Sequence, residues 1–134
     1  MEFAWLSRWQ PQLLAILRIV TGLLFLEHGL SKFFGFPVPF PVQPLTPMLM
    51  AAGTIEIVAG ILVTLGLFTR LAAFVASGEM AAAYFIGHFP KGFWPAANMG
   101  ENAILLCFIF LYIAAAGPGA WSIAGARSKS APIR

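Results

Sequence analysis

The stretch Leu13–Phe34, with the sequence LLAILRIVTGLLFLEHGLSKFF, decides the fold because it is long and almost wholly apolar. A helix needs about 20 residues to cross the hydrocarbon core of a bilayer. Three later stretches meet the same condition, and none of the four alternates between polar and apolar residues as a membrane strand does. We therefore predict four helical spans, at about residues 13–34, 48–68, 71–89 and 99–117.

The composition of the chain is typical of a protein that lives in a lipid bilayer. Of its 134 residues, 60% are hydrophobic and 10% are charged, whereas a soluble domain is about 25% charged. This composition excludes an ordinary soluble enzyme, a disordered chain and a nucleic-acid-binding domain. A single cysteine, Cys107, excludes a disulfide framework and a CxxC redox or zinc motif. The sequence thus predicts an all-α, integral membrane four-helix bundle that forms one domain over residues 1–134.

The basic residues predict how the bundle is oriented. One side of the membrane carries Arg8, Arg70, Arg127, Lys129 and Arg134, and the other carries Lys32 and Lys91. The positive-inside rule then places both termini and the turn at residues 66–69 in the cytoplasm. The two outer connections, residues 35–47 and 90–98, are rich in proline and aromatic residues. We expect them to lie on the bilayer surface or to fold back as lids.

The few acidic residues fall where charge is most costly. Each predicted span contains one glutamate, in the order Glu27, Glu56, Glu79 and Glu101. A charge at the middle of a span costs roughly 2.5–3.5 kcal/mol, so such residues face the bundle interior and have partners or a function. A purely structural network, in which glutamates neutralise basic residues, is one explanation, although the four glutamates outnumber the two cations in the spans.

Depth estimates group most of these residues into a polar cavity in the outer half of the bundle. Glu27, for example, lies roughly 7–8 Å below Lys32, at ~1.5 Å per helical residue. The predicted cavity residues are Glu27, His28, Lys32, Glu56, His88, Asn98, Glu101 and Asn102. Arg18 lies in the inner half, where it could reach Glu79, because their estimated depths differ by about 5 Å.

Helical geometry adds a constraint on this cavity. Arg18 and Glu27 are nine residues apart, as are Glu79 and His88, and residues at that spacing face opposite sides of a straight helix. Either the helices bend, or some of these side chains face another protomer, which favours a homo-oligomer. A stripe at i, i+4 spacing on the second span is suited to close helix packing, and it consists of Ala52, Glu56, Gly60 and Thr64.

Metal and haem sites fit this pattern less well than a quinone does. A di-metal carboxylate bundle uses Glu-x-x-His on two helices, but His28 directly follows Glu27, and His88 is nine residues from Glu79. A haem between His28 and His88 would have ligands at similar depth but would lie close to the membrane surface. A quinone head needs hydrogen-bond donors and a proton donor near the interface, with apolar walls around them. Proton transport through the intramembrane carboxylates also stays open.

The order and spacing of several motifs resemble the DoxX family over residues 14–123. The matching motifs are RIVTGLLF at 18–25, HGLxK at 28–32, ExxxGx5GxxTR at 56–70, His88, GFW at 92–94, Glu101 and GPGxWSI at 117–123. The closing motif departs from the usual pattern, since Ala120 replaces a basic residue and Ala124 replaces an aspartate.

The resemblance implies a small, multi-pass, four-helix protein of the bacterial inner (cytoplasmic) membrane. Members of the family resemble the membrane subunit of a quinone-linked thiosulfate oxidoreductase, and a related fold occurs in sterol-type isomerases and receptor-assembly chaperones. By this resemblance, a shared site would be lined by Arg18, His28, Lys32, Glu56, His88 and Glu101, and Asn102 lies next to the last of these.

We therefore expect a redox-associated membrane subunit that binds a quinone-like or other amphipathic small molecule. Lys32 and His28 would orient the head group, and Glu56 and Glu101 would exchange protons with it. The sequence contains no iron–sulfur or flavin motif, so electrons would come from a redox partner subunit or another cofactor. The alternative is a non-catalytic partner that stabilises or assembles other membrane proteins and uses its polar network for its own fold.

Overall fold

The computed structural model describes residues 2–130 of the chain, and the regular secondary structure among them is helical, with no strand. The elements, in order, are α1 (Ala4–Ser7), α2 (Gln10–Phe34), α3 (Pro47–Leu65), α4 (Thr69–Ala83), the π-helical turn η1 (Tyr84–His88), the 3-10 turn η2 (Phe89–Lys91), α5 (Pro95–Asn98), α6 (Glu101–Ala116) and α7 (Ile123–Ser130). The predicted all-α fold is thus confirmed for the described residues.

The long helices coincide with the predicted spans, but only two of them are long enough by themselves to cross a membrane. Among the described residues, α2 and α3 have the length and hydropathy of membrane helices, whereas α6 is apolar but has 16 residues. The 15 residues of α4 continue directly into the five residues of η1. Four membrane crossings therefore stay a prediction.

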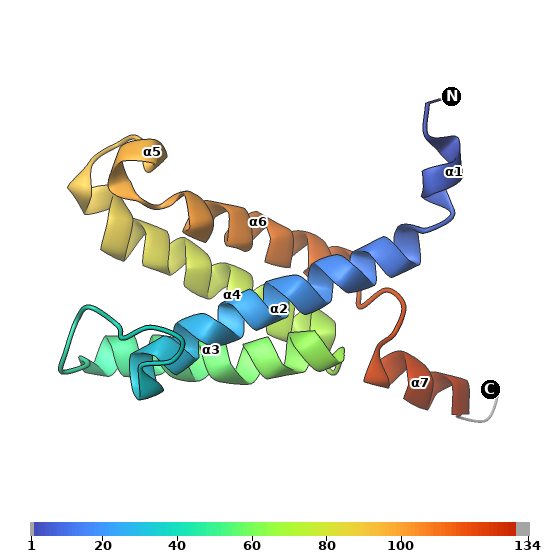
Figure 1. The fold of residues 1–134 in the computed structure, drawn as a ribbon, viewed down its shortest axis with the longest axis horizontal. Helices are drawn as coiled ribbons and strands as arrows, with labels where there is room; N and C mark the ends of the chain where they lie inside the picture. Colours follow the sequence, from blue (N-terminus) through green and yellow to red (C-terminus); the bar gives the residue numbers. More distant parts are fainter. Residues whose placement is uncertain (1, 131–134) are drawn as a thin grey trace.

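The helices are arranged as two pairs. α2 packs along α3 and α4 packs along α6, while contact between α2 and α6 is sparse. Figure 1 shows α1 and α7 at one end of the molecule, here called the terminal end. The chain between α2 and α3 lies at the opposite end with α5, here called the loop end, where the pairs diverge. The location of α1 and α7 at one end is what the predicted topology requires.

A tight turn joins α3 to α4, as the sequence predicts. Gly66 ends α3 in the left-handed conformation, with φ of 74°, which glycine adopts without steric cost. Its amide donates a hydrogen bond to the Val63 carbonyl, and α4 begins at Thr69. This turn holds the two helix pairs together at the terminal end.

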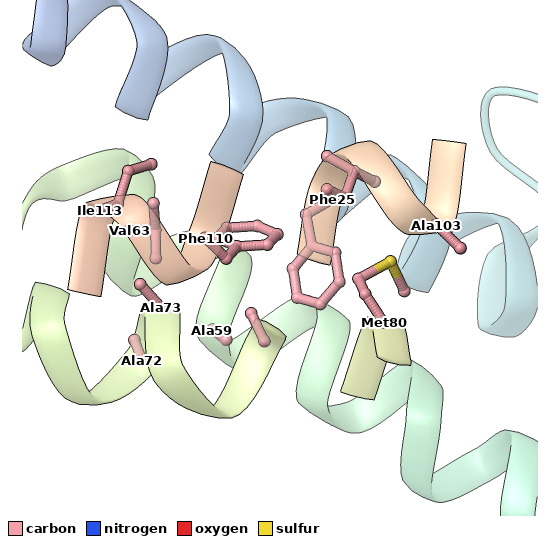
Figure 2. Packing of buried hydrophobic residues seen from close by; sticks show 11 residues of the cluster. Phe25, Ala59, Val63, Ala72, Ala73, Met80, Ala103, Phe110 and Ile113 are labelled. Atoms are coloured by element: carbon pink, nitrogen blue, oxygen red, sulfur yellow. The ribbon is translucent and has the colours of Figure 1, made fainter. Parts of the chain in front are cut away.

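The apolar core lies where the two pairs meet. The Phe25 and Phe110 rings pack edge to face, with their centroids 4.8 Å apart. Figure 2 shows small side chains such as Ala59 and Ala73 nearby. Small residues let helix backbones approach closely in a membrane. Met80 belongs to the loop-end part of the same cluster, so the core forms the floor of the space between the diverging pairs.

Glycines set the distance between α2 and α3. A Cβ atom on Gly29 would lie 2.8 Å from the Gly53 carbonyl oxygen, and one on Gly60 would lie 3.0 Å from the Leu26 backbone. The predicted small-residue stripe on the second span is thus divided between two uses. Gly60 and Thr64 face α2, whereas Ala52 and Glu56 line the cavity described below.

Candidate functional site

A cavity of about 600 Å³ lies at the loop end, between the α2–α3 pair and the α4–α6 pair. Its walls are mostly apolar. The polar residues that line it are His28, Lys32, Glu56, Glu79, His88 and Asn102. Five of these were predicted from the sequence to share a site, namely all except Glu79. The volume is in the range of about 300–1,000 Å³ that is typical of small-molecule sites.

A buried ion pair joins α2 to α3 inside the cavity. The Lys32 Nζ atom lies 2.7 Å from Glu56 Oε1, and both side chains are buried. The Phe40 ring covers the ammonium group, with 4.8 Å between Nζ and the ring centroid. A cation over an aromatic face is stabilised by the ring quadrupole. The connection 35–47 was expected either to lie on the bilayer surface or to fold back as a lid. At Phe40 it folds back over the cavity.

Glu79 adds a second carboxyl group beside this ion pair. It lines the same cavity and lies within electrostatic range of Glu56 and Lys32. Both of its carboxyl oxygens are buried, and the Glu56 carboxyl group lies within hydrogen-bonding range, so the two groups can share one proton. A carboxyl group can form more hydrogen bonds than Glu56 supplies, so Glu79 has capacity left for a molecule in the cavity.

The π-helical turn brings His88 to the same cavity as Glu79. In an α-helix these two residues would face opposite sides, but the i→i+5 turn η1 absorbs one extra residue between them. The carbonyl of Asn98 lies 3.0 Å from His88 Nδ1, and the buried Asn98 side chain bonds to Tyr84, Gly92 and Gly100. The second outer connection therefore fixes the position of His88.

Arg18 lies outside this cavity. Its guanidinium group is fully buried and donates hydrogen bonds to the carbonyl oxygens of Pro118, Ala120 and Trp121. These carbonyls belong to the closing motif at the terminal end. The prediction that Arg18 could reach Glu79 is wrong, because the loop carbonyls occupy the guanidinium group.

Two of the predicted intramembrane glutamates face outwards. Glu27 and Glu101 are exposed and do not line the cavity. The sequence therefore predicted the correct end of the molecule for Glu101, but not the correct face of its helix. Asn102, the next residue, does line the cavity. The burial of Arg18 and the exposure of Glu27 agree with the half-turn offset expected from their spacing.

Two contributors to the site were missed by the sequence reasoning. The sequence places Glu79 near mid-membrane, at a depth that Arg18 could reach, and its role stays open there. The nine-residue spacing predicts that Glu79 and His88 face opposite sides, since nothing in the sequence marks a π-helical turn. Phe40 lies in a connection whose proline content predicts an irregular path but not its direction. Two features of the sequence could have placed these residues at the site. Glu79 lies deep within its span, and Phe40 lies in the connection that follows Lys32.

The cavity combines hydrogen-bonding groups with an apolar enclosure. Residues 2–130 contain no group of three or more His, Cys, Asp or Glu side chains arranged to hold a metal ion. The groups that line the cavity are an ammonium and a paired carboxylate, a second carboxyl group and two imidazoles, set in an apolar wall. This arrangement can orient an amphipathic molecule and exchange a proton with it.

Comparison with known proteins agrees with the motifs in the sequence. The DoxX family matches residues 13–89. An uncharacterized protein of Haemophilus influenzae is 48% identical over 124 residues, covering 88% of this chain and 92% of the relative. The inner membrane protein YphA of Escherichia coli is 34% identical, covering 85% and 89% of the two chains.

A third relative has a name that refers to an activity. A putative oxidoreductase, CatD, of Bacillus subtilis is 42% identical over 60 residues, covering 42% of this chain and 45% of the relative. No solved structure matches the chain. The relatives identify the chain as a membrane protein, and one of them is named for the inner membrane.

Proposed function

The chain belongs to the DoxX family, and on that premise we propose that it is a redox-associated membrane subunit that binds a quinone-like molecule in the cavity at the loop end. The observation that carries the proposal is the buried Glu79 carboxyl group that faces the cavity beside the Lys32–Glu56 ion pair. An empty, apolar pocket would not need these groups. A ligand with a polar ring and an apolar body would satisfy both the carboxyl group and the walls.

The residues of the cavity fit a quinone head. A quinone has carbonyl oxygens that accept hydrogen bonds, and its reduced form has hydroxyl groups that donate them. Lys32 can donate to a carbonyl oxygen while Glu56 holds the ammonium group in place. Glu79 can accept from a hydroxyl group or deliver a proton to a carbonyl oxygen, and His88 is fixed beside them by Asn98.

The protein supplies binding, orientation and proton exchange, and the quinone supplies the electron-carrying chemistry when it is bound. Apolar side chains such as Leu106 and Ile55 exclude water around the head group. The relative in Bacillus subtilis that is named a putative oxidoreductase supports the redox part of the proposal. Because this sequence has no iron–sulfur or flavin motif, we assign the electron donor to a partner subunit.

The test is mass spectrometry of quinones in protein extracted gently from the membrane. We expect wild-type protein to carry quinone and Glu79→Leu protein to carry about tenfold less, because a hydrogen bond to a charged group contributes roughly 1.5–3 kcal/mol. The matched control is Glu27→Leu, which removes an exposed glutamate outside the cavity and should keep the quinone.

The melting temperature separates this function from a structural role. Leucine in place of the buried Glu79 carboxyl group removes the desolvation cost of that group, so it should raise the melting temperature of ligand-free protein while quinone occupancy falls. A wild-type protein free of quinone, combined with a lower melting temperature for Glu79→Leu, would contradict the proposal. That result would favour the assembly-partner alternative, in which the polar cluster only supports the fold.

A further inference from the structure

The rim of the cavity is apolar on one side and polar on the other. The lining residues that are also exposed on α3, α4 and η1 carry no charge and no strong hydrogen-bonding group, and they are Met48, Ala51, Val75, Ala82, Ile86 and Gly87. On the side of α2 and α6, the exposed lining includes His28 and Asn102, with Met99 just before α6. The exposed rim therefore has an apolar side, here called the α3–α4 opening, and a polar side, here called the polar opening.

The α3–α4 opening is suited to a hydrocarbon chain. α3 and α4 are joined by a tight turn at the terminal end, so the space between them widens only towards the loop end, where these apolar rim residues lie. Ala51 and Ala82 are small and exposed, one on each wall. In a bilayer this opening would face lipid tails, and a bound molecule could extend an apolar chain through it without burying a polar group.

The interior of the cavity discriminates between head groups by charge. The Lys32 ammonium is already paired with Glu56 at 2.7 Å, so it has no free charge to offer an anion. The paired Lys32 and Glu56 groups are neutral overall, so an ionic head would bring into this mostly apolar cavity a charge that the pair does not balance. An uncharged head avoids that cost, and it can still form a hydrogen bond with the Glu79 carboxyl group.

We propose that the ligand is an uncharged lipid that enters sideways from the bilayer, with its head at Glu79 and its hydrocarbon tail leaving between α3 and α4 past Ala51 and Ala82. This inference rests on the proposed function, and it adds the route of entry and the need for a tail. It also assigns the polar opening, with His28 and Asn102, to the side from which protons reach the head group.

The experiment compares two benzoquinones with the same head, one carrying a decyl tail and one without a tail. Binding is measured as the concentration-dependent rise in melting temperature in detergent. In Ala82→Trp, the affinity for the tailed quinone should fall about tenfold, because excluding two methylene groups from the opening is sufficient for that change. The affinity for the tailless quinone should stay within about twofold of wild type.

Two further variants make the result specific. Ala51→Trp obstructs the opening from α3 and should reproduce the effect, so the test does not depend on the folding of one variant. Gly78→Trp is the control, since Gly78 is exposed on α4, lies outside the cavity and has no neighbouring atom within 4 Å of an added Cβ. It should leave binding of both quinones unchanged.

The outcomes separate this inference from the proposed function. If wild-type protein binds neither quinone, the proposed function itself fails. If wild-type protein binds both quinones and the two obstructing variants weaken both equally, or weaken neither, the function stands and the tail route between α3 and α4 is overturned.

Discussion

Arg18 and Lys32 lie on the same helix and both are buried, yet they have different roles in the molecule. Lys32 is paired with a carboxylate inside the cavity. Arg18 instead donates to three backbone carbonyls of the closing motif, where the planar guanidinium fork can reach several acceptors at once. A buried cation that donates hydrogen bonds to three backbone carbonyls is a structural clamp, so Arg18 holds the chain after α6 against α2.

This difference predicts the effect of removing the Arg18 side chain. Arg18→Met should lower the free energy of unfolding by about 3 kcal/mol, because it leaves three partly buried carbonyls without the Arg18 donor. Arg70→Met should lower it by less than about 1 kcal/mol, since Arg70 is exposed and bonds to the last carbonyls of α6. Thermal unfolding in detergent measures both.

The same variant also tests where the site lies. Folded Arg18→Met protein should bind quinone like wild type, because Arg18 does not line the cavity. Loss of quinone from Arg18→Met protein that remains folded would contradict the assignment of Arg18 to the fold rather than to the site.

At the residue scale, the sequence predicted which side chains matter better than it predicted their partners. Lys32, Glu56, His28, His88 and Asn102 were assigned to one cavity from depth alone, and the structure places them together. The partner of Arg18 could not be predicted, because backbone carbonyls are present at every residue and leave no mark in the sequence.

At the scale of elements, two local features bring the cavity together. Close packing at Gly29 sets the α2–α3 distance one turn from the Lys32–Glu56 pair. The π-helical turn η1 rotates the last part of the third span so that His88 joins Glu79. π-helical turns are often found at functional sites, and this one has a direct geometric consequence for the cavity.

The glycine contact predicts a contrast between two substitutions. Gly29→Ala should lower the free energy of unfolding by about 1–3 kcal/mol, because the new methyl group meets the backbone of α3 and cannot be accommodated by a side-chain rotation. Gly78→Ala should raise it by up to about 1 kcal/mol, since Gly78 is exposed within α4 and alanine favours a helix. Equal effects of the two substitutions in thermal unfolding would contradict the close α2–α3 contact.

The sequence predicted the helices well and their irregularities poorly. The spans predicted at 13–34 and 48–68 agree with α2 and α3 to within a few residues, because long apolar runs dominate the signal. The third predicted span, 71–89, is divided into α4 and η1. A change from i→i+4 to i→i+5 hydrogen bonding depends on packing around Tyr84 and Asn98, which hydropathy does not report.

At the scale of the whole molecule, the termini and the cavity lie at opposite ends. α1, α7 and the turn between α3 and α4 are at the terminal end, whereas α5 and the connection between α2 and α3 are at the loop end (Figure 1). If the positive-inside rule holds for this chain, the cavity lies in the outer half of the membrane. Arg134 lies outside the described residues, so its predicted position on the cytoplasmic side rests on the sequence alone.

The central claim is that an uncharged, quinone-like lipid occupies the cavity at Glu79. Photolabelling with a tailed quinone that carries an azide on its ring, followed by peptide mapping, tests this most directly. The label should fall on cavity-lining residues such as Met80 and Leu106, and both excess unlabelled quinone and Glu79→Leu should suppress it. The claim would be contradicted if the label were spread over exposed residues outside the cavity, such as Phe74 and Phe108, and if excess unlabelled quinone did not reduce it.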